Sequence, residues 1–178
     1  MSAVKTLGKD LKEHRLVFFG AGSAATGVAA EIVKFFVKEG NMTEEEATAH
    51  FWLVDSKGLV TTNRGDELAP HKLPFARSDN GDLQLRNLQA TIEHVKPTAL
   101  IGLSVQTGAF DEGIIRTMAR IQERPIIFPL SNPTSKSECT FAQAVEWTDG
   151  KVIFASGSPF DVIDYKGAHY TPGQGNNM

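Results

Sequence analysis

A glycine-rich turn carries the clearest chemical signal in this sequence of 178 residues. The apolar run Leu16–Phe19 leads directly into Gly20-Ala21-Gly22-Ser23-Ala24-Ala25, and a helical pattern follows. In such a G-x-G-x-x-A string the first glycine allows a tight turn, the second lets the backbone approach a pyrophosphate, and the third small residue lets helix and strand pack closely. The helix N-terminus then offers its N–H groups to phosphates. The strand before and the helix after favour a dinucleotide site over a plain turn.

An acidic residue is the second part of this fingerprint, because a carboxylate at the end of the second strand binds the adenosine ribose. Asp55 closes the run Phe51–Val54 in that place. It lies further from Gly20 than the usual spacing of about 20 residues, because an extra helix, capped at Thr43, intervenes. The alternative is that Asp55 is only a turn residue.

The residues after Asp55 bear on which cofactor is bound. A carboxylate favours NAD, because it repels the 2′-phosphate of NADP. Ser56 follows directly, and the next loop carries Arg64, His71 and Lys72. A hydroxyl and a mobile cation could offset the repulsion and admit NADP, whereas a solvated basic loop explains the same spacing equally well.

Three further β-rich runs each lead into small polar residues. The runs are Ala99–Leu103, Pro125–Phe128 and Val152–Phe154, and the polar segments are Ser104–Gly108, Ser131–Thr134 and Ser156–Pro159. Each segment alone could be a turn or a helix cap. Ligands of doubly wound sheets bind across the carboxyl ends of the strands, so three such segments at one edge favour a site for the nicotinamide end. Asn132 could hydrogen-bond a carboxamide or a hydroxy acid there without placing a charge beside the hydride path.

The elements that must position these residues alternate along the chain. Amphipathic helical patterns cover Ala24–Val37, Leu85–Val95 and Glu112–Ile121, and Thr43 with Glu46 forms a capping box before another helix. The stretch Thr61–Asp82 is rich in Gly, Pro, Asn and Asp and is predicted to be a surface loop. Strands alternating with helices predict an α/β fold over residues 1–178: one doubly wound parallel sheet, that is, a Rossmann-type NAD(P)-binding domain.

Composition limits the other functions. Hydrophobic residues make up 41% and charged residues 22%, and the net charge of −3 comes without a basic run, so no nucleic-acid partner is expected. No apolar run approaches the roughly 20 residues that span a bilayer, so no membrane partner is expected. The single cysteine, Cys139, excludes an internal disulfide and fits a reducing compartment, so we expect the cytoplasm or the mitochondrial matrix.

Acid–base and metal chemistry have no convincing carriers in this chain. There is no H-x-x-x-H, no C-x-x-C and no Ser-His-Asp motif, and Glu44–Glu46 is predicted to be a solvated helix face. The five histidines are predicted to be surface residues: His14, His50, His71, His94 and His169. We therefore assign no catalytic residue and no metal ligand to this chain.

Several strings together resemble the malic enzymes. They are FFGAGSAATGVA, WLVDSKGLV, KPTALIGLS, ERPIIFPLSNPTSKSEC, IFASGSPF and PGQGNN, in the family's order and over nearly the whole chain. The resemblance implies an NAD(P)- and divalent-metal-dependent oxidoreductase that decarboxylates malate to pyruvate. It also implies that this chain is the cofactor domain alone. The Mg²⁺ or Mn²⁺ ligands and the acid–base groups would belong to an N-terminal portion of the parent enzyme, which is expected to be a homo-oligomer.

The resemblance also implies roles for individual residues. Asn132, Asn176 and Asn177 match positions that contact malate, and Ser56 and Lys72 match positions that accompany NADP preference, so NADP is slightly favoured over NAD. Two positions depart from the family pattern: Ser23 replaces a common acid, and Gln106 is bulkier than usual. The expected cofactor site is Gly20, Ala21, Gly22, Ser23, Ala24, Ala25, Asp55, Ser56, Lys72, Ser104, Val105 and Asn132.

Two other functions stay open at this point. A malolactic enzyme would use the same cofactor domain to make lactate. A non-catalytic nucleotide-binding module would use the turn without any turnover. For the malic enzyme domain by itself, we expect this chain to bind cofactor without oxidising malate.

Overall fold

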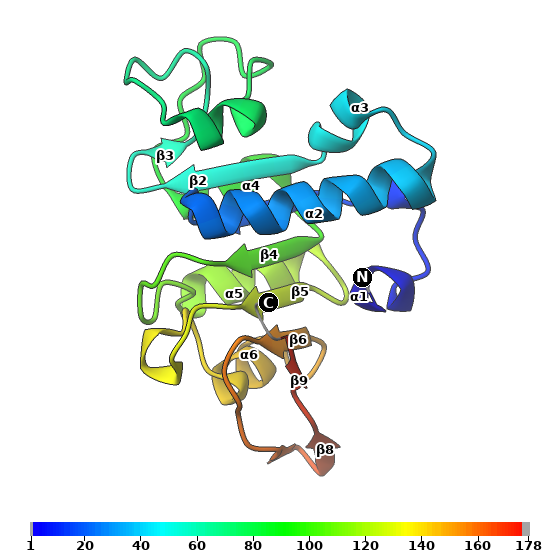
Figure 1. Cartoon of the computed structure of the whole chain (residues 1–178). Coiled ribbons are helices and arrows are strands. Elements are labelled where there is room, and N and C mark those ends of the chain that lie inside the picture. The colour runs from blue at the N-terminus through cyan, green and yellow to red at the C-terminus, as the bar shows by residue number, and fades with distance from the viewer. Residues whose placement is uncertain (1, 176–178) are drawn as a thin grey trace.

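A seven-stranded sheet in the order β3-β2-β1-β4-β5-β6-β9 organises the computed structural model, which describes residues 2–175 (Figure 1). All neighbouring strands are parallel except the β2–β3 pair. The strands are β1 (Leu16–Phe19), β2 (Phe51–Asp55), β3 (Gly58–Leu59), β4 (Ala99–Gly102), β5 (Ile126–Pro129), β6 (Ile153–Ser156) and β9 (Gly173–Gln174). A separate hairpin joins β7 (Ile163–Tyr165) to β8 (Ala168–Tyr170).

Helices cover both faces of the sheet, with α2 across the near face in Figure 1 and α4 and α5 behind it. The α-helices are α1 (Ser2–Thr6), α2 (Ser23–Gly40), α3 (Glu44–Thr48), α4 (Leu88–Val95), α5 (Glu112–Ile121) and α6 (Phe141–Trp147). Short 3-10 helices are η1 (Leu11–Glu13), η2 (Pro70–Phe75) and η3 (Thr134–Lys136). The predicted doubly wound α/β fold is confirmed.

Two apolar layers lie on either side of the sheet, because successive strand residues point to opposite faces. On the α2 side, Phe18 and Phe51 are fully buried and pack with Phe36 of α2. On the other side, Val17 belongs to a cluster that includes Ile115 of α5. Each such buried side chain contributes about 1.5–3 kcal/mol relative to exposure. The carboxyl ends of the strands are thereby held at one rigid edge.

The order in which strands are added to the sheet reverses between β1 and β4. The chain runs from β1 outward to β2, and the return through α4 places β4 on the other side of β1. In doubly wound sheets, this switch point is where ligands bind. The register pairs Phe19 with both Val54 and Gly102, so the turn that begins at Gly20 lies between the ends of β2 and β4.

The predicted surface loop Thr61–Asp82 is more ordered than its composition suggests. It contains η2, whose Phe75 is buried against Phe51. It also carries Arg64, whose side chain is only 3% exposed. Clustered Gly, Pro, Asn and Asp predicted irregular backbone, but they did not reveal that the segment packs back onto β2.

Other sequence predictions are corrected in detail. His14 is fully buried rather than on the surface, with Nδ1 3.0 Å from Thr98 Oγ1, and burial lowers the pKa of its imidazole. The predicted helix Leu85–Val95 begins only at Leu88, because the Asn87 side chain accepts from the backbone N–H of Ala90 and caps it there. Within residues 2–175, no helix combines the length and apolar character needed to cross a membrane.

Candidate functional site

The glycine turn brings β1 into α2 with almost no spare room. Gly20 has a φ of +117°, which favours glycine, and its N–H donates to the Val54 carbonyl at 2.8 Å. A Cβ at Gly20 would lie 2.5 Å from the Leu103 carbonyl oxygen. Ala25, the third small residue, is 1% exposed because it packs inside. The first and third positions of the motif are therefore small for packing reasons that the sequence predicted.

The opposite side of the same turn is open. A Cβ at Gly22 would meet nothing within 4 Å, and Gly22 is the N-cap of α2 without a side-chain cap. The first N–H groups of the helix, from Ser23 to Ala25, therefore remain available at the positive end of the helix dipole. This arrangement fits a pyrophosphate, because it offers uncapped donors and leaves clear the space that a side chain would fill.

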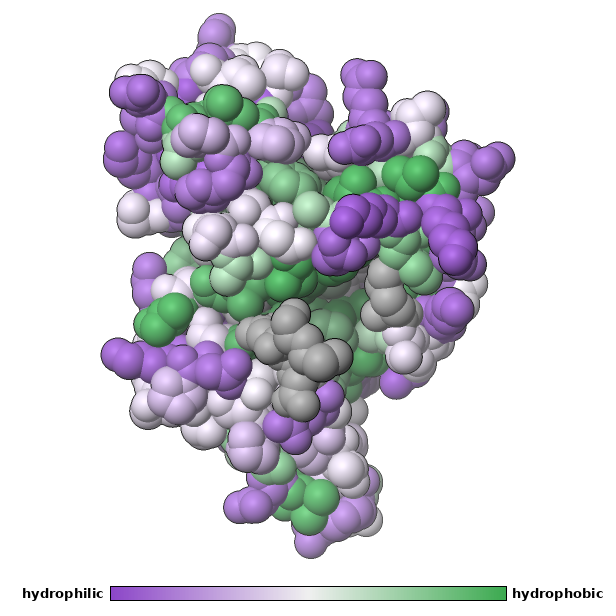
Figure 2. All heavy atoms as spheres, in the orientation of Figure 1, coloured by the Kyte–Doolittle hydropathy of each residue, from purple (hydrophilic) through white to green (hydrophobic). Residues whose placement is uncertain are grey.

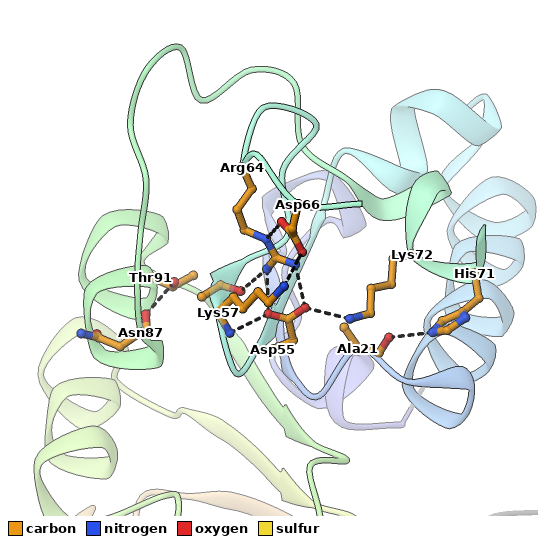
Figure 3. A network of polar contacts seen from close by, with 10 residues as sticks. Ala21, Asp55, Lys57, Arg64, Asp66, His71, Lys72, Asn87 and Thr91 are labelled. Atoms are coloured by element: carbon orange, nitrogen blue, oxygen red, sulfur yellow. Dashed lines mark hydrogen bonds and ion pairs between the residues drawn. The ribbon is translucent and has the colours of Figure 1, made fainter. Parts of the chain in front are cut away.

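A network of charged side chains surrounds Asp55 at the end of β2 (Figure 3). Arg64 donates from Nη1 to Asp55 Oδ1 at 2.6 Å and from Nη2 to Oδ2 at 2.9 Å, and Lys72 Nζ donates to Oδ2 at 2.8 Å. Arg64 also binds Asp66 through Nε at 2.7 Å, and Lys57 Nζ lies 3.2 Å from Asp66. Among these five side chains, three cations thus face two carboxylates, which gives a net charge of +1.

These contacts set the protonation states of the network. Burial alone would raise the pKa of Asp55, but the hydrogen bonds from Arg64 and Lys72 outweigh it and hold that pKa below its usual value. Hydrogen bonds from Arg64 also lower the pKa of Asp66, and Asp66 in turn raises the pKa of the Arg64 guanidinium. All three groups are therefore charged at neutral pH.

The short helix η2 joins this charged end to the glycine turn. Lys72 reaches Asp55, while the neighbouring His71 places Nε2 3.2 Å from the Ala21 carbonyl oxygen (Figure 3). Ser56, by contrast, is exposed in the turn after β2. Of the two residues expected to accompany NADP, Lys72 is held beside Asp55 by an ion pair and Ser56 is not fixed in this way.

The three polar strand ends lie together, as predicted, because β4, β5 and β6 are adjacent and parallel. The Val105 N–H donates to Ser131 Oγ at 2.9 Å, which links the first two segments. Ser158 Oγ donates to Asn132 Oδ1 at 2.7 Å, which links the second and third. Because Oδ1 is occupied, the Nδ2 group of Asn132 is the part of the amide that remains available as a donor.

Close packing fixes Asn132 as well. A Cβ at Gly157 would lie 2.8 Å from Asn132 Nδ2 and 2.4 Å from the Leu130 carbonyl oxygen. The strand β9 continues this edge, because Gln174 pairs with Ser156 of β6 and Gly175 N–H donates to the Ser156 carbonyl at 2.8 Å.

Figure 2 shows apolar side chains gathered across the middle of the viewed face, with more hydrophilic ones above and below.

Three residues of this region were not predicted: Arg64 as a buried partner of Asp55, Ser158 as a partner of Asn132, and Glu138. Glu138 is fully buried and accepts hydrogen bonds from Ser104 and Ser131. The SNPTSKSEC string contains this glutamate, but nothing in its spacing indicates burial. Asn176 and Asn177 lie outside the described residues. Within residues 2–175, no group of three or more His, Cys, Asp or Glu side chains could hold a metal ion.

Comparisons with known proteins agree with this geometry. A family model described as "Malic enzyme, NAD binding domain" matches residues 1–178. The chain is 53% identical over 178 residues to the NADP-dependent malic enzyme of Dictyostelium discoideum, covering 100% of this chain and 32% of that protein. It is 45% identical over 177 residues to the chloroplastic NADP-dependent malic enzyme of Zea mays, covering 99% of this chain and 27% of that protein.

A solved structure is similar too: the NAD-dependent malic enzyme of Thermotoga maritima, with a TM-score of 0.62, 26% identity, and coverage of 87% of this chain and 36% of that one. The fold and the turn define a nicotinamide-dinucleotide-binding domain of the Rossmann type. More narrowly, the chain belongs to the malic enzyme NAD-binding domain family. It spans about a third of the length of the curated relative from Dictyostelium.

Proposed function

We propose that this chain is the cofactor-binding part of a malic enzyme that oxidises malate and decarboxylates the product to pyruvate, and that it prefers NADP to NAD. The observation that carries the cofactor preference is the excess positive charge around Asp55. A bare carboxylate would repel a 2′-phosphate, but Arg64 and Lys72 pair with Asp55 while Lys57 pairs with Asp66, so these five side chains together carry a net charge of +1. The relatives named NADP-dependent support the same preference.

We assign separate groups of residues to the separate parts of the cofactor. The backbone of Gly20, Ala21 and Gly22 would lie against the pyrophosphate. The N–H groups of Ser23, Ala24 and Ala25 would donate hydrogen bonds to it. Asp55, Ser56 and Lys72 would hold the adenosine ribose and its phosphate. Ser104, Val105 and Asn132 would border the nicotinamide.

The proposed chemistry needs a well-positioned nicotinamide that is bordered by uncharged side chains. When bound, the nicotinamide supplies the acceptor for the hydride from C2 of malate. Asn132 would donate from Nδ2 to the cofactor carboxamide or to malate, without adding charge beside the reacting carbon. Asn176 and Asn177 would complete the contacts to malate. The divalent metal ion and the acid–base groups belong to the proposal for the longer enzyme.

A titration with separate cofactors tests this function. We expect the chain to bind NADP more tightly than NAD, and Lys72→Gln to weaken NADP binding about tenfold while changing NAD binding less, since the cation pairs with the 2′-phosphate. Lys151→Gln, at an exposed position away from the turn, is the control. Equal losses for both cofactors would contradict a role for Lys72 at the 2′-phosphate.

Turnover assays test the reaction. With malate and Mn²⁺, the 178-residue chain is expected to show no oxidation, whereas the longer parent enzyme is expected to release pyruvate and reduced cofactor. Release of lactate by the parent would indicate a malolactic enzyme instead. We further propose that the parent is a homo-oligomer of the cytoplasm or mitochondrial matrix, although chloroplastic forms occur among the relatives. Fractionation and light scattering of the parent would test both.

A further inference from the structure

Glu138 is a buried acid that the proposed cofactor contacts do not use. Glu138 lies between η3 and α6 and is fully buried. Its backbone carbonyl accepts a hydrogen bond from the Phe110 N–H at 3.0 Å. A carboxylate taken out of water needs strong hydrogen bonds, and an apolar side chain of similar volume is often more stable in such a place. Packing alone therefore gives no reason for an acid here.

The carboxylate of Glu138 joins two of the loops that border the proposed nicotinamide site. Its Oε1 accepts from the Ser104 backbone N–H at 3.0 Å, from Ser104 Oγ at 2.8 Å and from Ser131 Oγ at 2.5 Å. Ser104 follows β4 and Ser131 follows β5, so one oxygen atom ties together the ends of two strands.

The same network reaches Val105, whose backbone is strained. Val105 has a φ of +58°, which is a true outlier for a β-branched residue, and its side chain is exposed. Its N–H donates to Ser131 Oγ, while that hydroxyl donates to Glu138. Glu138 therefore acts on Val105 through Ser131, and an unfavourable backbone conformation is held at the edge of the site.

Gly102 of β4 leaves free the space that the Glu138 carboxylate occupies. A Cβ at Gly102 of β4 would lie 2.5 Å from Glu138 Cδ and 2.6 Å from Oε2. Glu138 Oε2 is buried and has no hydrogen-bond partner among the described residues. All three hydrogen bonds of the carboxylate thus converge on Oε1, the oxygen that faces the loops.

We propose that Glu138 is a positioning residue that sets the Ser104–Val105 segment and Ser131 for the nicotinamide half of the cofactor. This inference rests on the proposed function, because it presumes that the nicotinamide lies at this edge. It concerns only one end of the ligand. Within residues 2–175, no hydrogen bond joins the Asp55 network to the Glu138 network, so the adenosine end at Asp55 and the nicotinamide end can be tested separately.

The experiment compares NADP with 2′,5′-ADP, which lacks the nicotinamide half, by calorimetric titration of the 178-residue chain. Glu138→Met keeps the length of the side chain and removes the acceptor, so we expect NADP binding to weaken about tenfold, as for the loss of one or two hydrogen bonds, with 2′,5′-ADP binding unchanged. Glu138→Gln retains one acceptor oxygen and is expected to recover most of the loss. Glu146→Met, at an exposed position of α6, is the matched control.

Ser131→Ala gives a second test that disturbs the core less. It should weaken NADP binding about threefold in the wild-type background, for one hydrogen bond, and have no further effect beside Glu138→Met. Unchanged NADP binding by Glu138→Met, or parallel losses for NADP and 2′,5′-ADP, would overturn the inference alone. A wild-type chain that binds neither ligand would overturn the proposed function and this inference with it.

Discussion

The two ends of the candidate site solve the same problem of positioning with opposite chemistry. Around Asp55, charges of both signs, from the buried Arg64 to the exposed Lys57, pair directly with one another and leave an excess cation. Around Asn132, the hydrogen bonds join hydroxyls, a side-chain amide and backbone N–H groups, and the carboxylate that they reach, that of Glu138, is fully buried. Charge is thus placed where we propose that a phosphate binds, and is kept out of reach where we propose hydride transfer.

The glycine turn belongs to both ends, so its loss should have the largest effect. Gly20→Ala would place a Cβ 2.5 Å from the backbone of Leu103 at a φ of +117°. We expect it to destabilise the fold by about 3 kcal/mol, from backbone strain and overlap, and to abolish binding of both NADP and 2′,5′-ADP. Urea denaturation and titration of each ligand measure the two effects.

A neighbouring glycine supplies the comparison. Gly22→Ala has ordinary φ and open space, so its stability should stay within about 1 kcal/mol of wild type. Its methyl group would nevertheless occupy the cradle before α2, and binding of both ligands should fall. If Gly22→Ala were as unstable as Gly20→Ala, the division between a packing glycine and a binding glycine would be wrong.

The charged end can be disrupted by itself. Arg64→Met leaves Asp55 and Asp66 without their shared partner, and Arg64 is only 3% exposed, so we expect a loss of about 2–3 kcal/mol, less than for a fully buried pair. The pKa of Asp55 should rise toward its usual value. Binding of 2′,5′-ADP should weaken about tenfold, because the remaining carboxylates repel its phosphates.

The matched control is another arginine in an ion pair. Arg116 binds Glu112 along α5 with both side chains more than half exposed, so Arg116→Met should change stability by less than about 0.5 kcal/mol. Urea denaturation of both variants, with and without 2′,5′-ADP, checks the difference. Similar small losses from both would mean that the Asp55 network behaves like ordinary surface charge.

The same comparison explains what the sequence could predict. The strand at Leu16–Phe19, the turn at Gly20 and the shared edge of the polar segments follow from local patterns, namely hydrophobic period, glycine spacing and the parallel topology that these imply. Arg64 and Glu138 do not, because their burial depends on contacts between segments. Arg64 packs back onto β2 from a stretch whose composition predicts a loop, and Glu138 meets Ser104 from 34 positions away. Sequence patterns thus placed the residues of the candidate site at one sheet edge, while the residues that support them required the fold.

The neutral end provides the smallest and most selective test. Ser158→Ala removes the hydroxyl that donates to Asn132 Oδ1, so the amide can turn over and present the wrong group. We expect NADP binding to weaken about threefold, the size of one neutral hydrogen bond, and 2′,5′-ADP binding to stay unchanged. Ser78→Ala, in an exposed part of the loop before α4, is the control. Because Gly20→Ala acts on both ligands and Arg64→Met on the adenosine half, an effect of Ser158→Ala on NADP alone would show that the two ends are held independently. An equal loss of 2′,5′-ADP binding would show instead that they are coupled through the sheet edge.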